Sequence, residues 1–193
     1  WDLETTVKYG KGVEDGMLTS VGVVPKPLQK PYPPVFLPFA SSPNSIRWAA
    51  REGVTAILPP MHEAYQSPLF DLYAEVSGKP RGQGTGLLRD VIVADTDDEA
   101  MALWEDSGRF SGRAWFEPFG FRRGLMDPVT KNFATAKESI DLGYALVGTV
   151  DTVTRALEAN MKRQPVDWVF CYTYNALVPH GKLMKSTEAL WTK

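Results

Sequence analysis

The chain has 193 residues and a mass of 21.4 kDa, which allows one domain with its own core or part of a larger domain. Hydrophobic residues make up 44% and charged residues 23%, and this composition excludes a disordered chain. The formal net charge of −2 excludes the basic footprint of a nucleic-acid-binding protein, and no apolar run approaches the about 20 residues of a membrane span.

The leading segment, residues 1–34, is rich in glycine, lysine and proline. Proline forces extended backbone and interrupts helices, so we predict an irregular loop over this segment. The chain opens with WDLETTVKYG, which has neither an initiator methionine nor a signal-peptide pattern, and we expect it to be a piece of a longer polypeptide.

A short strand and a helix start follow the leading segment. The run VFLPF, residues 35–39, is apolar and bounded by turn residues, which predicts a buried strand. Ser42 is a good N-cap, Pro43 suits the first helical position, and Gly53 suits the helix end. We therefore predict a helix that begins at the carboxyl end of this strand.

Two further strands come next. We predict strands over residues 55–60 and 87–94, with a helix over about residues 65–77 between them. After the second of these strands, Thr96 and Glu99 have the spacing of a capping box, which predicts another helix start.

Residues 107–135 form a long stretch rich in glycine, arginine and aromatic residues. A loop of this length inside a compact domain is usually functional or disordered. Its aromatic residues argue against disorder, so we predict an insertion that covers the site as a lid. These aromatic residues are Phe110, Trp115, Phe116, Phe119 and Phe121.

The remaining sequence contains one more strand between two helices. A helix follows Gly148 and Thr149, residues 166–174 form a strand, and a last helix starts near His180. Strands and helices thus alternate four times, which predicts an α/β fold with parallel strands and helical crossovers. Both a doubly wound sheet and half of a (β/α)8 TIM barrel fit this order.

Four segments resemble the C-terminal half of the luciferase-like flavin-dependent monooxygenases. Their order and spacing carry the resemblance, which spans roughly residues 20–193. It implies a single domain, residues 1–193, that holds about the last four β/α units of a (β/α)8 TIM barrel. The segments are PKPLQKPYPPVF, ASSPNSIRWAAREG, LLRDVIVADTDDEA and LVGTVDTVTRALEANMKRQPVDWVFCY.

This family binds flavin mononucleotide (FMN) or, in some branches, a deazaflavin. The resemblance implies a monooxygenase that oxidises a small, apolar organic substrate with O2 and reduced FMN, which a separate flavin reductase supplies. It also implies a homo-oligomer, or pairing with the N-terminal half of the barrel, because the family's first four units are absent here. A deazaflavin-dependent oxidoreductase and a non-catalytic flavin-binding or scaffold subunit remain as alternatives.

The serine-rich turn after the first strand is the candidate cofactor site. Its residues precede or open a helix at the carboxyl end of a strand, where free N–H groups and the helix dipole favour a phosphate. A plain helix N-cap explains the same residues, and the resemblance favours the phosphate of FMN. The candidate cofactor-binding residues are Ser41, Ser42, Asn44 and Ser45.

The two histidines are the candidates for proton transfer. His62 follows the second strand and would face the site of a barrel, so it is the candidate catalytic residue. The alternative for His62 is a loop histidine without a chemical role. His180 opens the last helix, and we interpret it as a structural or surface residue.

The long insertion supplies the candidate substrate-binding residues, which are Trp115, Phe116, Phe119 and Arg122. Aromatic side chains can line an apolar pocket, and an arginine can hold an anionic group. Packing of the aromatic residues and a solvated cluster of arginines are the alternatives.

The sequence predicts no metal site. The acidic run Asp95, Asp97, Asp98 and Glu99 fits a helix start matched to the helix dipole, and no zinc or calcium ligand spacing occurs. We interpret the single cysteine, Cys171, as an inert thiol within the last strand. A lone cysteine suits a reducing compartment, and we expect a cytoplasmic protein.

Overall fold

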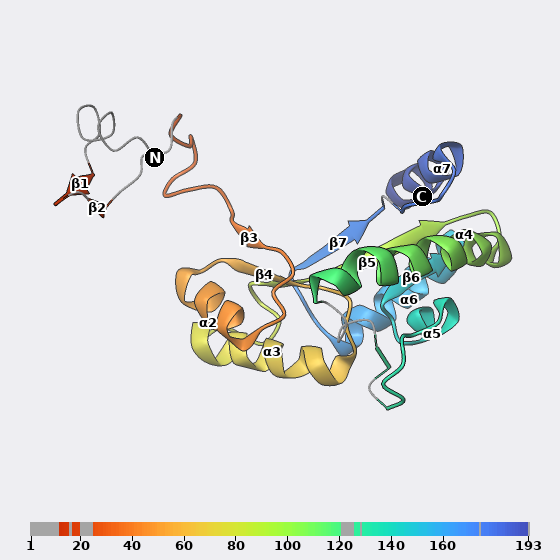
Figure 1. Ribbon diagram of the computed structural model, residues 1–193, viewed down its shortest axis with the longest axis horizontal. Helices are drawn as coiled ribbons and strands as arrows, with labels where there is room; N and C mark the ends of the chain where they lie inside the picture. The colour runs from red at the N-terminus through yellow and green to blue at the C-terminus, as the bar shows by residue number, and fades with distance from the viewer. Residues whose placement is uncertain are drawn as a thin grey trace. The chain divides into compact units, whose positions relative to one another are not determined.

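The computed structural model describes residues 12–15, 17–19, 25–120, 126–127, 129–173 and 175–192. The chain divides into two compact units, Trp1–Pro34 and Val35–Lys193. In the first unit, strand β1 (Val13–Glu14) pairs antiparallel with strand β2 (Met17–Leu18), so part of the expected loop forms a short hairpin. The sheet and the helices described below belong to the second unit (Figure 1).

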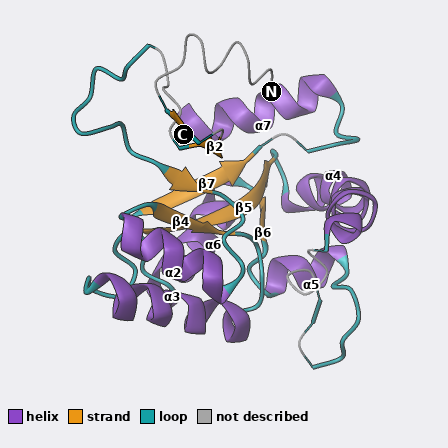
Figure 2. Ribbon diagram, turned by 60° about the vertical axis from the view of Figure 1, so that its left-hand side comes forward, coloured by secondary structure: helices purple, strands orange, loops and turns teal. Residues whose placement is uncertain are grey.

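The second unit is built on a parallel sheet with β5 at its centre. Gly86 of β5 pairs with Ile57 of β4 and also with Trp168 of β7, so β4 and β7 lie on opposite edges of β5. Asp90 pairs with β6 and β7, which places β6 on the same edge as β4, nearer the carboxyl end (Figure 2). The strands are β3 (Phe36–Leu37), β4 (Thr55–Leu58), β5 (Thr85–Val93), β6 (Ala145–Gly148) and β7 (Trp168–Tyr172).

Helices connect these strands, and the alternation confirms the expected α/β class with parallel strands. Strand β6 and helix α5 are additional to the predicted elements. Since β6 is short and buried along its whole length, its sequence has no alternation by which to recognise a strand. The helices are α2 (Pro43–Glu52), α3 (Glu63–Ser77), α4 (Asp97–Phe110), α5 (Ala136–Asp141), α6 (Val150–Arg163) and α7 (His180–Thr192).

Helical backbone continues beyond α4, where the sequence predicts an irregular loop. A π-helix, η1 (Ser111–Phe116), and a 3₁₀ helix, η2 (Glu117–Phe119), extend the chain as far as Gly120. Glycine lowers helix propensity, but at Gly108 it permits close packing, because a Cβ there would lie 2.6 Å from the Trp104 ring. The helix therefore continues through residues whose propensity for helix is low, and the Trp104 ring packs on its own helix at Gly108.

Helix α2 has the ends that its sequence predicts. The Ser42 side chain accepts a hydrogen bond from the Ser45 N–H at 3.2 Å, and Pro43 occupies the first turn. At the other end, Gly53 has a left-handed φ of 69° and its N–H bonds to the Ala49 carbonyl oxygen. These caps fix the start of α2 directly after β3.

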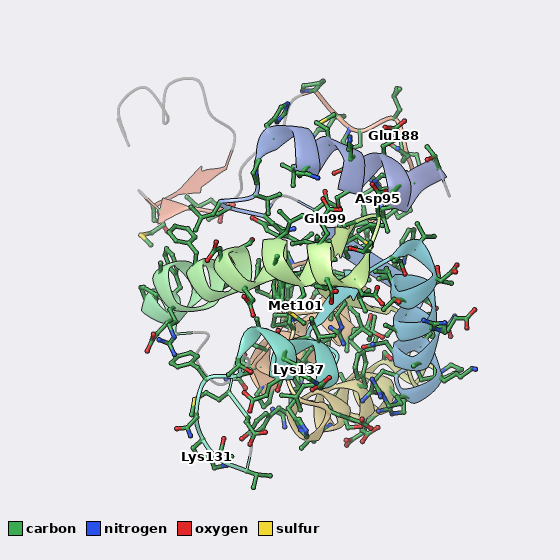
Figure 3. All side chains as sticks on the ribbon, turned by 90° about the vertical axis from the view of Figure 1, so that its right-hand side faces the viewer. Asp95, Glu99, Met101, Lys131, Lys137 and Glu188 are labelled. Atoms are coloured by element: carbon green, nitrogen blue, oxygen red, sulfur yellow. The ribbon has the colours of Figure 1, made fainter. Side chains whose placement is uncertain are left out.

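The start of α4 differs from the predicted capping box. Thr96 accepts a hydrogen bond from the Glu99 N–H at 3.1 Å, but the Glu99 carboxylate pairs with Lys182 of α7 instead of returning to Thr96. Figure 3 shows Glu99 and Asp95 on the side of α4 that faces α7. The complete capping box lies at α5, between Thr135 and Glu138.

One face of the sheet is covered by four helices. Leu87 of β5 packs in a core cluster with residues of α2 and α3, which lie side by side in Figures 1 and 2. Val91 and Val93 point to the same side as Leu87, because side chains alternate along a strand, and they pack against α6 and α7. This face therefore matches the outer, helix-covered layer of a barrel.

Among the described helices, α4 covers the carboxyl end of the opposite face of the sheet, called the inner face below. Ile92 packs there against Ala100 and Trp104 of α4. Further back on the same face, Phe36 of β3 contacts Trp168 of β7, with ring centroids 5.3 Å apart. In a flat sheet three strand spacings would separate these strands by about 14 Å, so the contact indicates a strongly curled, barrel-like sheet.

Candidate functional site

An apolar cavity, called cavity 1, lies at the carboxyl ends of β3 and β4. It has a volume of about 390 Å³ and most of its lining residues are apolar. Parallel α/β folds bind their ligands at this edge of the sheet. The lining consists of Phe39, Ser41, Pro43, Pro59, Pro60, Met61, Ala64, Tyr65, Pro68, Leu69, Asp90, Phe116 and Gly120.

A second cavity, cavity 2, adjoins the first and has a volume of about 490 Å³. Residues of α4, η1 and α5 line it, among them Trp104 and Arg113. Pro60, Asp90 and Phe116 line both cavities, so these three residues form the wall between them. Together the cavities make one divided space beneath the insertion.

The insertion reaches cavity 1 through Phe116, whose ring centroid lies 5.8 Å from that of Phe39. Phe116 thus lines both cavities, in keeping with its predicted role in substrate binding. Phe119 is 65% exposed and lines neither cavity. The side chain of Trp115 and the whole of Arg122 lie outside the described residues, so their roles stay predictions.

The serine-rich turn lies beside cavity 1 at the start of α2. Ser41 lines the cavity, whereas Ser42 and Ser45 bond to each other, with their hydroxyl oxygens 2.9 Å apart. The Ser45 N–H also donates to Ser42, so the capping role foreseen as the alternative for this pair is present. Their predicted role in cofactor binding remains open, and Asn44 is exposed beside them.

His62, the predicted catalytic residue, is the N-cap of α3. Its Nδ1 accepts a hydrogen bond from the Ala64 N–H at 3.1 Å, so the imidazole caps the first turn of the helix. His62 lines a small polar cavity of about 150 Å³ on the outer face and neither cavity 1 nor cavity 2. The catalytic role of His62 stays a prediction.

Asp90 is the acidic residue that both cavities share. It lies on the inner face of the central strand, and no side chain among the described residues donates a hydrogen bond to its carboxyl group. Burial raises the pKa of Asp90 to about 7, and the neighbouring Arg89 guanidinium opposes this shift only in part. A carboxyl group that changes charge near neutral pH is thus placed at the centre of the divided space.

Sequence reasoning missed Asp90, although a signal existed. The strand around it, LLRDVIVA, is almost entirely apolar, and an acidic residue within such a strand is unusual. Its neighbour Arg89 points to the outer face, where it is 3% exposed and donates to the Asn160 side chain at 3.2 and 3.3 Å. The side chains of Arg89 and Asp90 therefore point to opposite faces of the sheet.

Within the acidic run at the start of α4, Asp97 is hydrogen-bonded to the start of α6. The Asp97 carboxylate accepts from the Thr149 N–H at 2.7 Å and from the Thr152 hydroxyl at 3.1 Å, and these bonds lower the pKa of Asp97. Within the part of the chain that the structure describes, no three His, Cys, Asp or Glu side chains are placed to hold a metal ion. Burial raises the pKa of the Cys171 thiol, which keeps it protonated.

Comparison with solved structures finds proteins of similar fold. The chain superposes on monooxygenase RslO1 from Streptomyces bottropensis with a TM-score of 0.66 and 19% identity, over 86% of this chain and 48% of that chain. The oxygenating constituent of 3,6-diketocamphane monooxygenase from Pseudomonas putida, solved with FMN, gives 0.61 and 21%, over 82% and 46%. Long-chain alkane monooxygenase LadA gives 0.55 and 16%, over 82% and 40%.

These neighbours confirm the expected fold, an α/β arrangement that forms part of a (β/α)8 barrel. The chain spans about half the length of the structures it matches. No protein-family model matches the sequence, and no curated protein matches it. Among the described residues, no helix has both the length and the apolar character needed to cross a membrane.

Proposed function

We propose that the chain is part of a flavin-dependent monooxygenase that oxidises a small, apolar organic substrate with reduced FMN and O2. The observation that carries the proposal is the position of cavity 1, which is apolar and adjoins the start of α2 at the carboxyl edge of the sheet. The monooxygenases of similar fold support the class of reaction, and the neighbour solved with FMN supports the cofactor.

The start of α2 fits the phosphate of FMN. Pro43 has no N–H, and the Ser45 N–H is occupied by Ser42. Among the described residues, the Asn44 N–H and the Ser41 hydroxyl have no hydrogen-bond partner, and the helix dipole favours an anion there. We therefore assign the phosphate to Ser41 and Asn44, with Ser42 and Ser45 holding the turn in shape.

When bound, reduced FMN supplies the electrons for the reaction with O2. The tasks of this chain's residues are to bind the substrate and to keep water away. The mostly apolar lining of cavity 1 suits a hydrocarbon framework, and Phe39 and Phe116 close one side of the cavity. Asp90 is the acid within the same space.

The inner face needs a cover before such a site can exclude water. Trp168 is 47% exposed and Tyr172 is 38% exposed on this face, and the outer edges of β3 and β7 have no partner strand among the described residues. Closed barrels remove such edges. We propose that further β/α units cover this face, either the N-terminal half of the same protein or a second copy. A separate flavin reductase delivers the reduced cofactor.

A titration with FMN tests the proposal. The chain is prepared as it is and together with the residues encoded upstream of Trp1, and quenching of flavin fluorescence is followed. We expect binding by the longer form, and loss of binding when Ser41→Leu fills the turn. Ser77→Leu, at the far end of α3, is the matched control and leaves binding intact.

The same titration addresses the alternatives. Absence of FMN binding by both forms would remove this cofactor and the monooxygenase proposal with it. Repeating the titration with a deazaflavin then separates a deazaflavin-dependent oxidoreductase, which binds it, from a non-catalytic scaffold subunit, which binds neither flavin.

A further inference from the structure

The small cavity that His62 lines on the outer face, called cavity 3, has no part in the proposed function. Its volume is about 150 Å³ and most of its lining residues are polar. The lining joins the start of α3, the end of α5, the last turn of α6 and Arg89 of β5. Three helices and the central strand therefore meet around one polar space.

The buried guanidinium of Arg89 is the strongest feature of cavity 3. Arg89 is 3% exposed, and among the described residues no carboxylate lies within ion-pair distance of it. Its hydrogen bonds go to neutral acceptors, the Asn160 side chain and the Leu88 carbonyl oxygen. A buried charge without an opposite charge is strongly destabilising, so this guanidinium favours an anion beside it.

The guanidinium of Arg89 also has donors to spare. A guanidinium carries five N–H groups, and the three hydrogen bonds within the described residues leave one on Nη1 and one on Nη2 without an acceptor. These two nitrogens can together hold two oxygens of one anion. Because Arg89 lines cavity 3, an anion inside the cavity can accept from both.

A second arginine adjoins the first. Arg163 lines cavity 3, is exposed, and has neither a hydrogen bond nor an ion pair within the described part of the chain. A Cβ on Gly143 would lie 3.2 Å from both Nη2 of Arg163 and Oδ1 of Asn160, so Arg163 lies next to the amide that accepts from Arg89. Burial lowers the pKa of Arg89 to about 10, with Asp90 opposing this shift and Arg163 adding to it.

The start of α3 offers further donors to the same cavity. His62 and Glu63 both line it, and α3 is 15 residues long. The Glu63 N–H has no acceptor among the described residues, whereas the Ala64 N–H is bonded to Nδ1 of His62. Since Nδ1 accepts, the neutral imidazole carries its proton on Nε2 as another donor. The dipole of α3 also favours an anion here.

The lining contains acceptors as well, and these discriminate between anions. Glu63 and Asp141 are both exposed, and Asp141 is paired with Lys137 at 2.6 Å. Gln66 is 2% exposed and donates from Nε2 to the Pro59 carbonyl oxygen, which leaves its Oε1 as an acceptor. An anion that carries a proton of its own fits such a lining best. Hydrogen phosphate has a hydroxyl group that can donate, whereas sulfate has none.

We propose that cavity 3 binds a hydrogen phosphate ion between the guanidinium groups of Arg89 and Arg163. The ion accepts from both arginines and from the start of α3, and its own hydroxyl donates to the Gln66 side chain. Because these residues belong to β5, α6 and α3, the ion joins three elements of the outer layer and stabilises the folded chain. The inference goes beyond the proposed function, since the phosphate of FMN is assigned to Ser41 and Asn44.

Thermal unfolding of the full chain without FMN tests this site. At neutral pH and constant ionic strength, about 20 mM phosphate should raise the melting temperature by about 3–6 °C, and the same concentration of sulfate by less than about 1 °C. Sulfate thereby controls for the general stabilising effect of both salts. Phosphorus NMR gives a direct measurement, because the phosphate signal should broaden when the unaltered chain is added.

Three arginine variants make the test specific. Arg89→Met removes the buried charge and should abolish both the phosphate-dependent rise and the broadening. Arg163→Gln changes an exposed residue, so the chain still folds, and phosphate binding should weaken about tenfold. Arg51→Gln is the matched control, because Arg51 is also an exposed arginine in the last turn of its helix, and it should bind phosphate as the unaltered chain does. If Arg89→Met does not fold, the comparison of Arg163→Gln with Arg51→Gln decides.

Several results would overturn the phosphate site. These are no rise with phosphate in the unaltered chain, an equal rise with sulfate, phosphate binding that survives in Arg89→Met, or equal losses in Arg163→Gln and Arg51→Gln. FMN quenching on the same samples reports the proposed function separately, and Arg163→Gln should leave it unchanged. Loss of FMN binding together with phosphate binding in Arg163→Gln would assign cavity 3 to the cofactor and remove the separate site.

Discussion

The rings of Phe36 and Trp168 lie at 87° to each other with centroids 5.3 Å apart, although two strands separate β3 from β7. Phe170, two residues further along β7, contacts the same ring of Phe36, also at 5.3 Å. Gly86 lies between these strands on the inner face, and a Cβ there would lie 2.6 Å from Ile57 and 3.1 Å from Trp168. The absence of a side chain at Gly86 lets the aromatic residues meet across the curled sheet.

The first prediction concerns this aromatic contact. Phe36→Ala removes two edge-to-face contacts and should lower the free energy of unfolding by about 2–4 kcal/mol. Urea unfolding followed by circular dichroism measures the effect. Trp191→Ala, at an aromatic residue of α7 that is 69% exposed, is the control and should change stability by less than about 0.5 kcal/mol. Equal effects of both variants would contradict the curled arrangement.

The second prediction separates capping from cofactor binding in the serine-rich turn. Ser42→Ala removes the acceptor for the Ser45 N–H and should destabilise the protein by about 1 kcal/mol, while Ser42→Asp restores the cap. Ser41→Ala should leave stability within about 0.5 kcal/mol and weaken FMN binding. Thermal unfolding and FMN quenching on the same samples measure the two effects. An unchanged FMN affinity in Ser41→Ala would remove the phosphate assignment of Ser41.

The third prediction concerns the dependence of stability on pH. Because burial raises the pKa of Asp90 to about 7 in the folded chain, the folded state binds more protons than the unfolded state between the unfolded pKa and that value. The contribution of Asp90 to stability is therefore complete below its unfolded pKa and is lost as pH rises through about 7. Asp90→Asn should be more stable than the unaltered chain above this pH, on the order of 2 kcal/mol.

Urea unfolding at several pH values measures this effect, with Glu105→Gln as the control. The two curves for the unaltered chain and Asp90→Asn should converge towards acidic pH. Parallel curves across the whole range would show that the Asp90 carboxyl is not buried as the fold places it.

The fourth prediction concerns a close approach of two backbone segments. Gly82 has a φ of 92°, and a Cβ there would lie 2.0 Å from the Pro165 carbonyl oxygen. Gly82→Ala combines a left-handed backbone with a clash and should cost more than about 2 kcal/mol. Gly181→Ala, in α7 where nothing lies within 4 Å, should be neutral or stabilising. Thermal unfolding compares the two, and a neutral Gly82→Ala would refute the packing of the turn before β5 against Pro165.

Capping and turn residues predicted the helix ends correctly where the stabilising hydrogen bonds join residues close together in the sequence. The Ser42 cap, Pro43 in the first turn and the Gly53 end of α2 are all present as predicted. Their hydrogen bonds join residues a few positions apart, so the sequence contains both partners. The same reasoning was wrong at Glu99, because a charge on α7, Lys182, attracts its carboxylate more strongly than the nearby backbone does.

The positions of the candidate site residues likewise depend on contacts between distant parts of the sequence. Phe116 lines both cavities and His62 lines neither of them, and the predicted roles of both residues stay predictions. The direction of a side chain at a strand end depends on how the following helix is capped. At His62 the cap uses the imidazole itself, and the pattern of apolar residues contains no sign of this.

The sequence by itself determined the alternation of strands and helices, the helix ends and the likeness to half of a luciferase-like barrel, because each of these depends on local bonding or on the order of segments. Only the tertiary structure decided that Phe36 meets Trp168 and that Asp90 lies between two cavities. Those relationships join residues from separate strands and helices. They are fixed by the curl of the sheet and by the packing of the insertion, in which long-range contacts outweigh local propensity.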